Sequence, residues 1–312
     1  MAKRPNLIGF GSVAVDDLLF LPFFPEPDSK LQVEKHLRLG GGLAGTALVA
    51  AARLGAISAY FGVFGHNDLS DFTLDAFQAE GVQTHLCLRE ADAKPLHSTI
   101  LVDQSSGRRT ILFSVDGFRS PPEGEISAEV FDECQMIFID TFSLAIIDHV
   151  CSLAKSLQIP ILADIEDTTI LDHLDALNKI DHLILNIQMA RDVTGKKEPA
   201  EVLEALETPI RTASVITAGA EGCWYKELHK PVYYMPAYPV DAIDTTGCGD
   251  VFHGAYAAAI LRTCNIPNAV KQASAAAAIK ATRAGGRAGI PNLEQLEQFI
   301  AAHNHLTPVE SV

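Results

Sequence analysis

The chain has 312 residues, of which 48% are hydrophobic, and a formal net charge of −15. This length and apolar content suit one large α/β domain or two small ones, and the strong negative charge argues against nucleic acid or an anionic membrane surface as a partner. Because the sequence shows no long uninterrupted apolar segment, no secretory leader and no ligand-like spacing of its six cysteines, we expect a cytoplasmic protein with free thiols.

Two strand-like segments open the chain. Residues 6–20 mix β-branched and small side chains, which predicts a buried strand followed by a turn or a second strand that carries Asp16 and Asp17. Residues 31–42 alternate apolar and polar side chains before they end in glycines. This alternation predicts a half-exposed strand.

A helix, a strand and a second helix are expected next. Small residues over 46–54 predict a short helix that Gly55 ends, and the apolar residues 59–65 predict a buried strand. Asp68 or Ser70 is the expected cap of the following helix, because either side chain can accept from a free backbone amide.

The middle of the chain combines a hairpin with a series of buried strands. Residues 97–115 form two alternating runs around a Ser-Ser-Gly turn, which is typical of a β-hairpin that serves as a flap. After a polar, proline-containing linker, helix-like segments separate several apolar runs, namely QMIFID, PILADIE, HLILN and SVITAG. This alternation predicts a mainly parallel sheet with helices on both faces.

Polar residues end these four apolar runs. They are Asp140, Asp164, Asn186 and Thr217. Because ligands collect at the carboxyl ends of parallel strands, we expect these four residues to share one rim of the sheet.

A glycine-rich turn precedes the most apolar helix, in the segment DTTGCGDVFHGA at 244–255. Gly247, Cys248 and Gly249 allow the backbone N–H groups and the positive end of the helix to face a phosphoryl group, which predicts an anion hole. Asp250 beside this hole suits a general base that deprotonates an attacking hydroxyl group. The alternative is that Asp250 is only the N-cap of the helix.

These residues carry a resemblance to a known family. DTTGCGDVFHGA resembles the second signature of the PfkB, or ribokinase-like, carbohydrate kinases, and GGGLAGTALVAAARLGA resembles the first. The resemblance implies a single kinase domain over 1–312 with a three-layer α/β fold and a small β-sheet lid from about 12–40 and 97–115. It also implies ATP and Mg²⁺ as cofactors, transfer of the γ-phosphoryl group to a hydroxymethyl group, and a homodimer formed through the lid.

The resemblance also assigns a substrate side. Asp16 matches the acid that holds sugar hydroxyl groups, with a solvated turn acid as the alternative and Asp17 as a weaker candidate. Backbone at Gly41 and Gly42 is expected to approach the sugar. The remaining two substrate-side positions are Thr46, at a position where many relatives have an asparagine, and Arg109 on the hairpin, for which protection of an edge strand is an equal alternative.

On the nucleotide side, Asn186 resembles the asparagine of the family's NxxE motif. The fourth position of that motif is Met189, which cannot hold magnesium-bound water. Three acids are candidates to substitute for the missing glutamate: Asp164, Glu166 and Asp167.

Two further groups of residues follow from the resemblance. Thr217, Gly219 and Gly222 in TAGAEG resemble the segment that lines the ATP phosphates and ribose, although an ordinary β-turn gives the same residues. Asp244 and Thr246 match a monovalent-cation site, so K⁺ is a further expected cofactor.

The sequence leaves the substrate open. TRAGGRAGIP resembles the sulfofructose kinase branch, and SGRRTILF also resembles ketohexokinase, which indicates a ketose or ketose-like substrate. A nucleoside kinase of the same family is one alternative. A non-catalytic sugar or nucleotide sensor, suggested by Met189, is the other.

Overall fold

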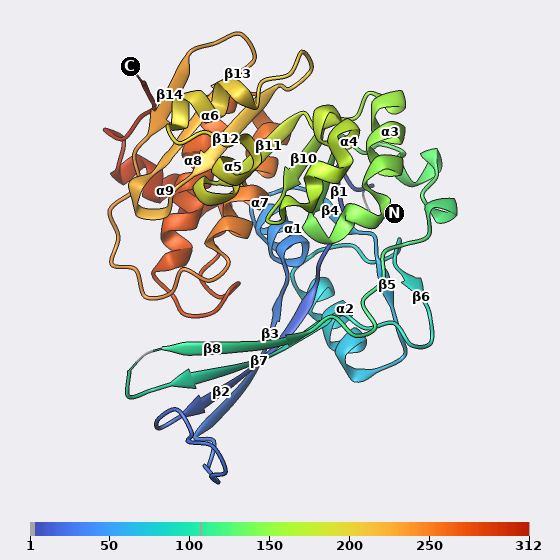
Figure 1. Cartoon of the computed structure of the whole chain (residues 1–312), viewed down its shortest axis with the longest axis vertical. Coiled ribbons are helices and arrows are strands. Elements are labelled where there is room, and N and C mark those ends of the chain that lie inside the picture. Colours follow the sequence, from blue (N-terminus) through green and yellow to red (C-terminus); the bar gives the residue numbers. More distant parts are fainter. Residues whose placement is uncertain (1–3, 107, 312) are drawn as a thin grey trace.

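A large mixed sheet forms the centre of the computed structural model, which describes residues 4–106 and 108–311 (Figure 1). Within these residues the sheet has nine strands in the order β15 (Val309–Glu310), β14 (Val232–Met235), β13 (Cys223–Glu227), β12 (Ala213–Thr217), β11 (His182–Asn186), β10 (Ile161–Asp164), β9 (Met136–Asp140), β1 (Leu7–Gly9) and β4 (Ser58–Tyr60). The pairs from β4 to β12 are parallel, and the pairs from β12 to β15 are antiparallel. The expected mainly parallel sheet is confirmed.

Helices cover both faces of this sheet and make three layers. Along β9, Met136 and Phe138 face a core with α1 (Leu43–Arg53), α7 (Cys248–Thr263), α8 (Ile266–Ala281) and α9 (Leu293–Ala302). Ile137 and Ile139 face the opposite core with α3 (Ile147–Leu157), α4 (Leu174–Lys179), α5 (Ile187–Thr194) and α6 (Pro199–Ala205). This alternation explains why the strands are apolar on both faces. Among the described residues, no helix combines the length and apolarity needed to span a membrane.

A smaller sheet extends away from the three layers (Figure 1). Its strand order is β3 (Lys35–Gly41), β2 (Ala14–Leu21), β7 (Leu96–Asp103) and β8 (Arg109–Ser114). Strands β7 and β8 are antiparallel, as expected for the hairpin, although Gly107 of its turn lies outside the described residues. We call this four-stranded sheet the lid.

The first helix begins earlier than the sequence indicated. It starts at Leu43 instead of Thr46, because the Leu43 amide donates to Ser12 Oγ at 2.9 Å and the Ala44 amide donates to Asp140 Oδ2 at 3.0 Å. Partners distant in sequence therefore satisfy the free amides of the helix start.

Two other local predictions were wrong. The expected strand over 59–65 divides, because β4 joins the large sheet whereas β5 (Val63–Phe64) pairs with β6 (Leu88–Arg89). The cap of α2 (Asp68–Ala79) is Asn67, whose side chain accepts from the Ser70 amide at 3.0 Å. Ser70 Oγ instead accepts from the Gly65 amide.

Candidate active site

The four polar strand ends lie along one edge of the large sheet, as predicted. Asp140 and Asp164 are register partners at the ends of β9 and β10, and Asn186 and Thr217 are register partners at the ends of β11 and β12. Parallel strands thus bring residues that are about 80 positions apart in the sequence into one row.

The turn before α7 has the geometry of an anion-binding site. Gly247 has a φ of 76° in the left-handed region and is the N-cap of the helix. A Cβ atom there would lie 2.9 Å from the Gly286 carbonyl oxygen, whereas Gly249 has nothing within 4 Å of its Cβ position. The Cys248 amide donates to the Thr245 carbonyl oxygen at 3.1 Å, so the amides of Gly247 and Gly249 are the ones that open space at the positive end of this 16-residue helix leaves for an anion.

Asp250 lies in the first turn of α7 but does not cap it. The cap is Gly247, and no side-chain cap hydrogen bond is present, so the alternative of a simple N-cap is wrong. Burial, followed by the negative charges of Asp164 and Glu166, raises the pKa of Asp250 well above its ordinary value, and Arg287 opposes this shift. A carboxylate with a raised pKa is a stronger proton acceptor than an exposed aspartate.

Asp140 and Asp164 are buried behind Asp250. Asp140 accepts hydrogen bonds from the Ser12 and Ala44 amides at 2.7 and 3.0 Å, so it holds the start of α1, and burial raises its pKa to about 6. Asp164 lies 3.3 Å from Nδ1 of His253, a residue that the sequence analysis missed. His253 also contacts the Gly249 and Ile184 carbonyl oxygens at 2.8 and 3.2 Å, and so connects the α7 start to the sheet.

The substrate-side residues meet where the lid joins α1. A Cβ atom on Gly41 would overlap the Asp16 carboxylate, so this backbone and side chain are in close contact. Gly42 has a φ of 86° and would place a Cβ atom 2.6 Å from the Ser12 carbonyl oxygen, so only glycine fits. Burial raises the pKa of Asp16, and a hydrogen bond from Ser98 opposes the shift.

Asp17 points to the other face of β2 and is fully paired. Its carboxylate contacts Arg38 Nε at 2.8 Å, His36 at 3.0 Å and His97 at 2.8 Å. The hydrogen bonds from Arg38 lower the pKa of Asp17. Asp17 therefore stabilises the lid and is not available to a ligand, which removes it as the weaker candidate.

Arg287 links the substrate side to Asp250, and sequence reasoning missed it. The residue is 9% exposed, and its guanidinium group donates to the Gly41 carbonyl oxygen at 2.6 Å and to Thr46 Oγ1 at 3.3 Å. Thr46 is only 1% exposed, and its hydroxyl group accepts from Arg287, so we find its side chain buried and not presented to a substrate. The charge of Arg287 acts on both Asp16 and Asp250.

Arg109 connects the lid to the turn before α7. Its Nη1 lies 3.2 Å from Asp244 Oδ1, and the two side chains are 44% and 18% exposed. Register pairs Arg109 with Val102 on β7. The hairpin therefore contacts the turn that carries the candidate anion hole, although Arg109 is already paired with an acid.

The nucleotide-side residues lie farther along the same edge. Asn186 is exposed and caps α5, accepting from the Met189 amide at 2.9 Å. The side chain of Met189 is 5% exposed and packs in the core, so it does not project toward the nucleotide-side residues. Gly219 is exposed with a φ of 56°, and Gly222 is buried against β14. Thr217 is half-buried beside them.

The three proposed substitutes for the missing glutamate divide into two groups. Asp164 and Glu166 are close enough to Asp250 to raise its pKa. Asp167 instead accepts from the Thr169 amide at 2.8 Å and caps a short 3₁₀ turn. Across residues 4–106 and 108–311, no three metal-ligating side chains of His, Cys, Asp or Glu cluster into a site.

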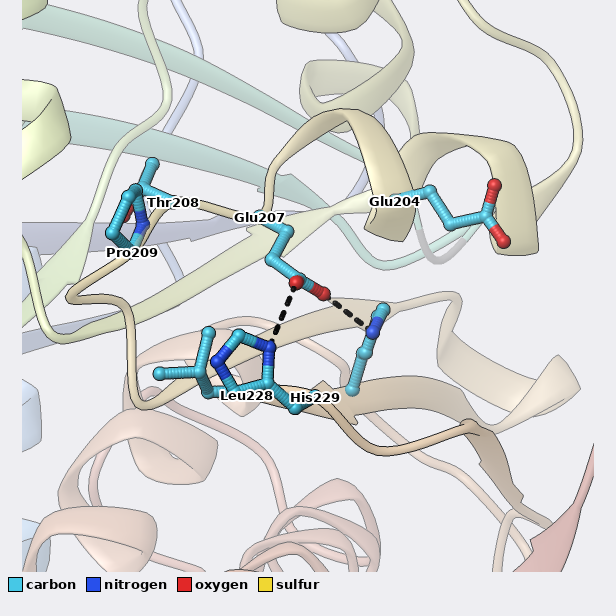
Figure 2. A pocket seen from close by; sticks show the side chains of 7 residues that line it. Glu204, Glu207, Thr208, Pro209, Leu228 and His229 are labelled. Atoms are coloured by element: carbon cyan, nitrogen blue, oxygen red, sulfur yellow. Dashed lines mark ion pairs between the residues drawn. The ribbon is translucent and has the colours of Figure 1, made fainter.

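A separate hollow of about 470 Å³ lies away from these residues, between the end of α6 and the turn after β13 (Figure 2). In Figure 2 the Glu207 carboxylate lies beside His229, with 3.7 Å between Oε1 and Nδ1, and Glu207 also forms an ion pair with Lys226. Because none of the predicted site residues lines the hollow, it is not part of the candidate active site.

Together the fold and the site define a phosphotransferase with an alcohol group as acceptor. Residues 7–293 match the model of the pfkB family carbohydrate kinases. The chain belongs to this family, and its fold is ribokinase-like.

Three similar proteins match over nearly their whole length. A ribokinase from Haemophilus influenzae is 26% identical over 95% of this chain and 99% of its own. A ribokinase candidate from Agrobacterium tumefaciens superposes with a TM-score of 0.85 at 24% identity, covering 97% of this chain and 99% of its own. A ribokinase II candidate from E. coli, in complex with ATP and Mg²⁺, has a TM-score of 0.80 at 18% identity, covering 96% of this chain and 100% of its own.

Proposed function

We propose that the chain transfers the γ-phosphoryl group of ATP to a hydroxymethyl group of a sugar or ketose-like substrate, with Asp250 as the general base. One observation carries the proposal: a carboxylate with a raised pKa lies in the first turn of α7, next to the amides of Gly247 and Gly249, whereas the Cys248 amide donates to the Thr245 carbonyl oxygen. The base then takes the proton of the attacking hydroxyl group, while the amides and the helix end stabilise the phosphoryl oxygens. Asp16, Gly41 and Gly42 orient the sugar.

Mg²⁺ fits this site as an ion that arrives with ATP. The described residues offer no ready-made cluster of metal ligands, but Asp164 and Glu166 provide an acidic edge near Asp250. Mg²⁺ commonly keeps several waters and is held by substrate phosphates with one or two carboxylates. Asn186, Thr217, Gly219 and Gly222 are the residues we assign to the nucleotide.

A substrate panel tests the proposed reaction. ADP release is measured with ATP and Mg²⁺ against ribose, deoxyribose, fructose, sulfofructose and adenosine, and the product is analysed by ³¹P NMR. We expect turnover with a sugar and a phosphate ester at its hydroxymethyl group. ATP binding without any acceptor-dependent ADP release would instead favour a sensor, and turnover with adenosine alone would favour a nucleoside kinase.

We also propose that two copies associate through the lid. Strand β8 is an edge strand of the lid, and its apolar side chains Ile111, Leu112 and Phe113 are 48%, 57% and 68% exposed. A second copy would cover this surface. The molar mass by sedimentation equilibrium is expected to be that of a dimer for the wild type and to fall toward the monomer for Phe113→Asp. A monomeric wild type at all concentrations would contradict the proposal.

A further inference from the structure

A fully buried lysine lies beneath the turn that carries the candidate anion hole. Lys280, near the end of α8, has an exposed fraction of 0%. Its Nζ donates to the Asp244 carbonyl oxygen at 2.8 Å. Helix α8 packs against α7, so the ammonium group reaches the turn from within the contact between these two helices.

Burial of an ammonium group is costly unless its surroundings compensate. Burial, and to a smaller extent the charge of Arg109, lowers the pKa of Lys280, whereas Cys248, Asp244 and Asp250 act in the opposite direction. The three residues that raise this pKa belong to the turn or to the first turn of α7. The positive charge of Lys280 is therefore directed at the candidate phosphate-binding segment.

Asp244 is held from several sides. Its carboxylate accepts from the Thr246 amide at 2.9 Å and from the Gly285 amide at 2.8 Å, and its own amide donates to the Ala281 carbonyl oxygen at 3.1 Å. Lys280 adds the contact to its carbonyl oxygen. The Asp244 carbonyl oxygen, which could coordinate a monovalent cation, is thus already bound to the Lys280 ammonium group.

A monovalent cation does not fit beside this ammonium group. The expected K⁺ site depends on oxygen atoms of Asp244 and Thr246, but a K⁺ ion bound to the Asp244 carbonyl oxygen would lie close to the Lys280 ammonium group, and the two positive charges would repel each other. A bound K⁺ would have to displace Lys280 from a packed core.

We propose that the Lys280 ammonium group takes the place of a monovalent cation, positions the 244–250 turn, and makes the enzyme independent of K⁺. The proposal rests on the proposed kinase function. Lys280 is a positioning residue: it fixes the Asp244 carbonyl and hence the direction of the amides at Gly247–Gly249. It also adds positive potential behind the candidate anion hole.

The test varies the monovalent cation at constant ionic strength, using tetramethylammonium, Na⁺, K⁺ and NH₄⁺ chlorides. Turnover and melting temperature are measured for the wild type and for Lys280→Ala, Lys280→Met and Lys271→Ala. Alanine leaves a space that a small cation can enter, whereas methionine fills the space without a charge. Lys271 is the other lysine of α8 and serves as the matched control.

For the wild type and Lys271→Ala we expect less than a twofold change in kcat among the four salts. Lys280→Ala is expected to lose about 10²-fold in kcat in tetramethylammonium, comparable to the loss of one oxyanion-hole donor, and to regain at least tenfold in K⁺ or NH₄⁺. Lys280→Met is expected to show the loss without rescue. Strong activation of the wild type by K⁺, or full activity of Lys280→Ala in tetramethylammonium, would overturn the proposal.

Melting temperatures separate this proposal from the kinase proposal. A cation that binds only the folded state stabilises it by mass action, so K⁺ is expected to raise the melting temperature of Lys280→Ala above its value in tetramethylammonium. The wild type is expected to melt at the same temperature in both salts. If no acceptor supports turnover, the kinase proposal fails while these measurements still decide the role of Lys280. A rise in the melting temperature of the wild type in K⁺ would contradict the proposed role of Lys280, even if Lys280→Ala does not fold.

Discussion

Replacing Asp250 by asparagine is expected to lower kcat by about 10²- to 10⁴-fold, the usual contribution of a positioned general base. Asparagine keeps the size of the side chain but cannot accept a proton from the substrate hydroxyl group. The KM for ATP is expected to change little, because the amides at Gly247–Gly249 remain. ADP release at saturating sugar and ATP measures both quantities.

A matched variant separates proton transfer from helix electrostatics. Glu294 is the first-turn acid of α9, so Glu294→Gln removes one negative charge from a helix start, as Asp250→Asn does. We expect kcat of this variant to equal that of the wild type. Equal small losses in the two variants would mean that Asp250 contributes only through its interaction with the helix dipole.

The pH dependence gives an independent check. Burial and the nearby acids raise the pKa of Asp250 above its ordinary value of 3.8, and the deprotonated form is the active base. Turnover of the wild type is therefore expected to fall as the pH falls through this raised pKa, with the acid limb above pH 3.8. The residual turnover of Asp250→Asn is expected to lack that limb. A wild-type limb at or below pH 3.8 would contradict the assignment.

The sequence predicted those features of the site that depend on local pattern. Asp140, Asp164, Asn186 and Thr217 were placed on one edge because each ends an apolar run, and parallel strands end together. The turn at Gly247 was predicted because glycine there allows a left-handed conformation at a helix start. Each of these predictions depends only on residues within a few positions of one another in the sequence.

The sequence did not predict features created by distant contacts. Arg287 lies in a glycine-rich tail and Lys280 in an alanine-rich helix, and cations in such segments are usually exposed. Both are buried only because β3, α1 and the 244–250 turn close around them. The α2 cap was missed for a different, local reason: the Ser70 hydroxyl group accepts from the Gly65 amide, and Asn67 caps the helix.

Gly254→Ala, at the contact between α1 and α7, is expected to have a second large effect, on the stability of the fold. A Cβ atom on Gly254 would overlap the Ala47 carbonyl oxygen and lie 2.8 Å from the Ala50 Cβ atom. Alanine is favoured over glycine in a helix by about 1 kcal/mol. The Ala47 backbone, however, cannot move away from the added methyl group as a flexible side chain could. Overpacking typically costs about 1–3 kcal/mol, and because this contact is with backbone we expect the upper part of that range, a net loss of about 1–2 kcal/mol, and a melting temperature lower by roughly 2–8 °C.

The same substitution at Gly249 shows whether this loss comes from helix packing. Gly249 lies in the same helix, but nothing is within 4 Å of its Cβ position, so Gly249→Ala is expected to melt at or above the wild-type temperature. Its methyl group would instead occupy open space beside the candidate anion hole, and kcat/KM for ATP is expected to fall while stability is kept. Thermal unfolding and ADP release of both variants test this contrast. Equal melting temperatures would mean that α1 and α7 can separate without cost, and the close approach at Gly254 would then not hold the substrate side and the phosphate side together.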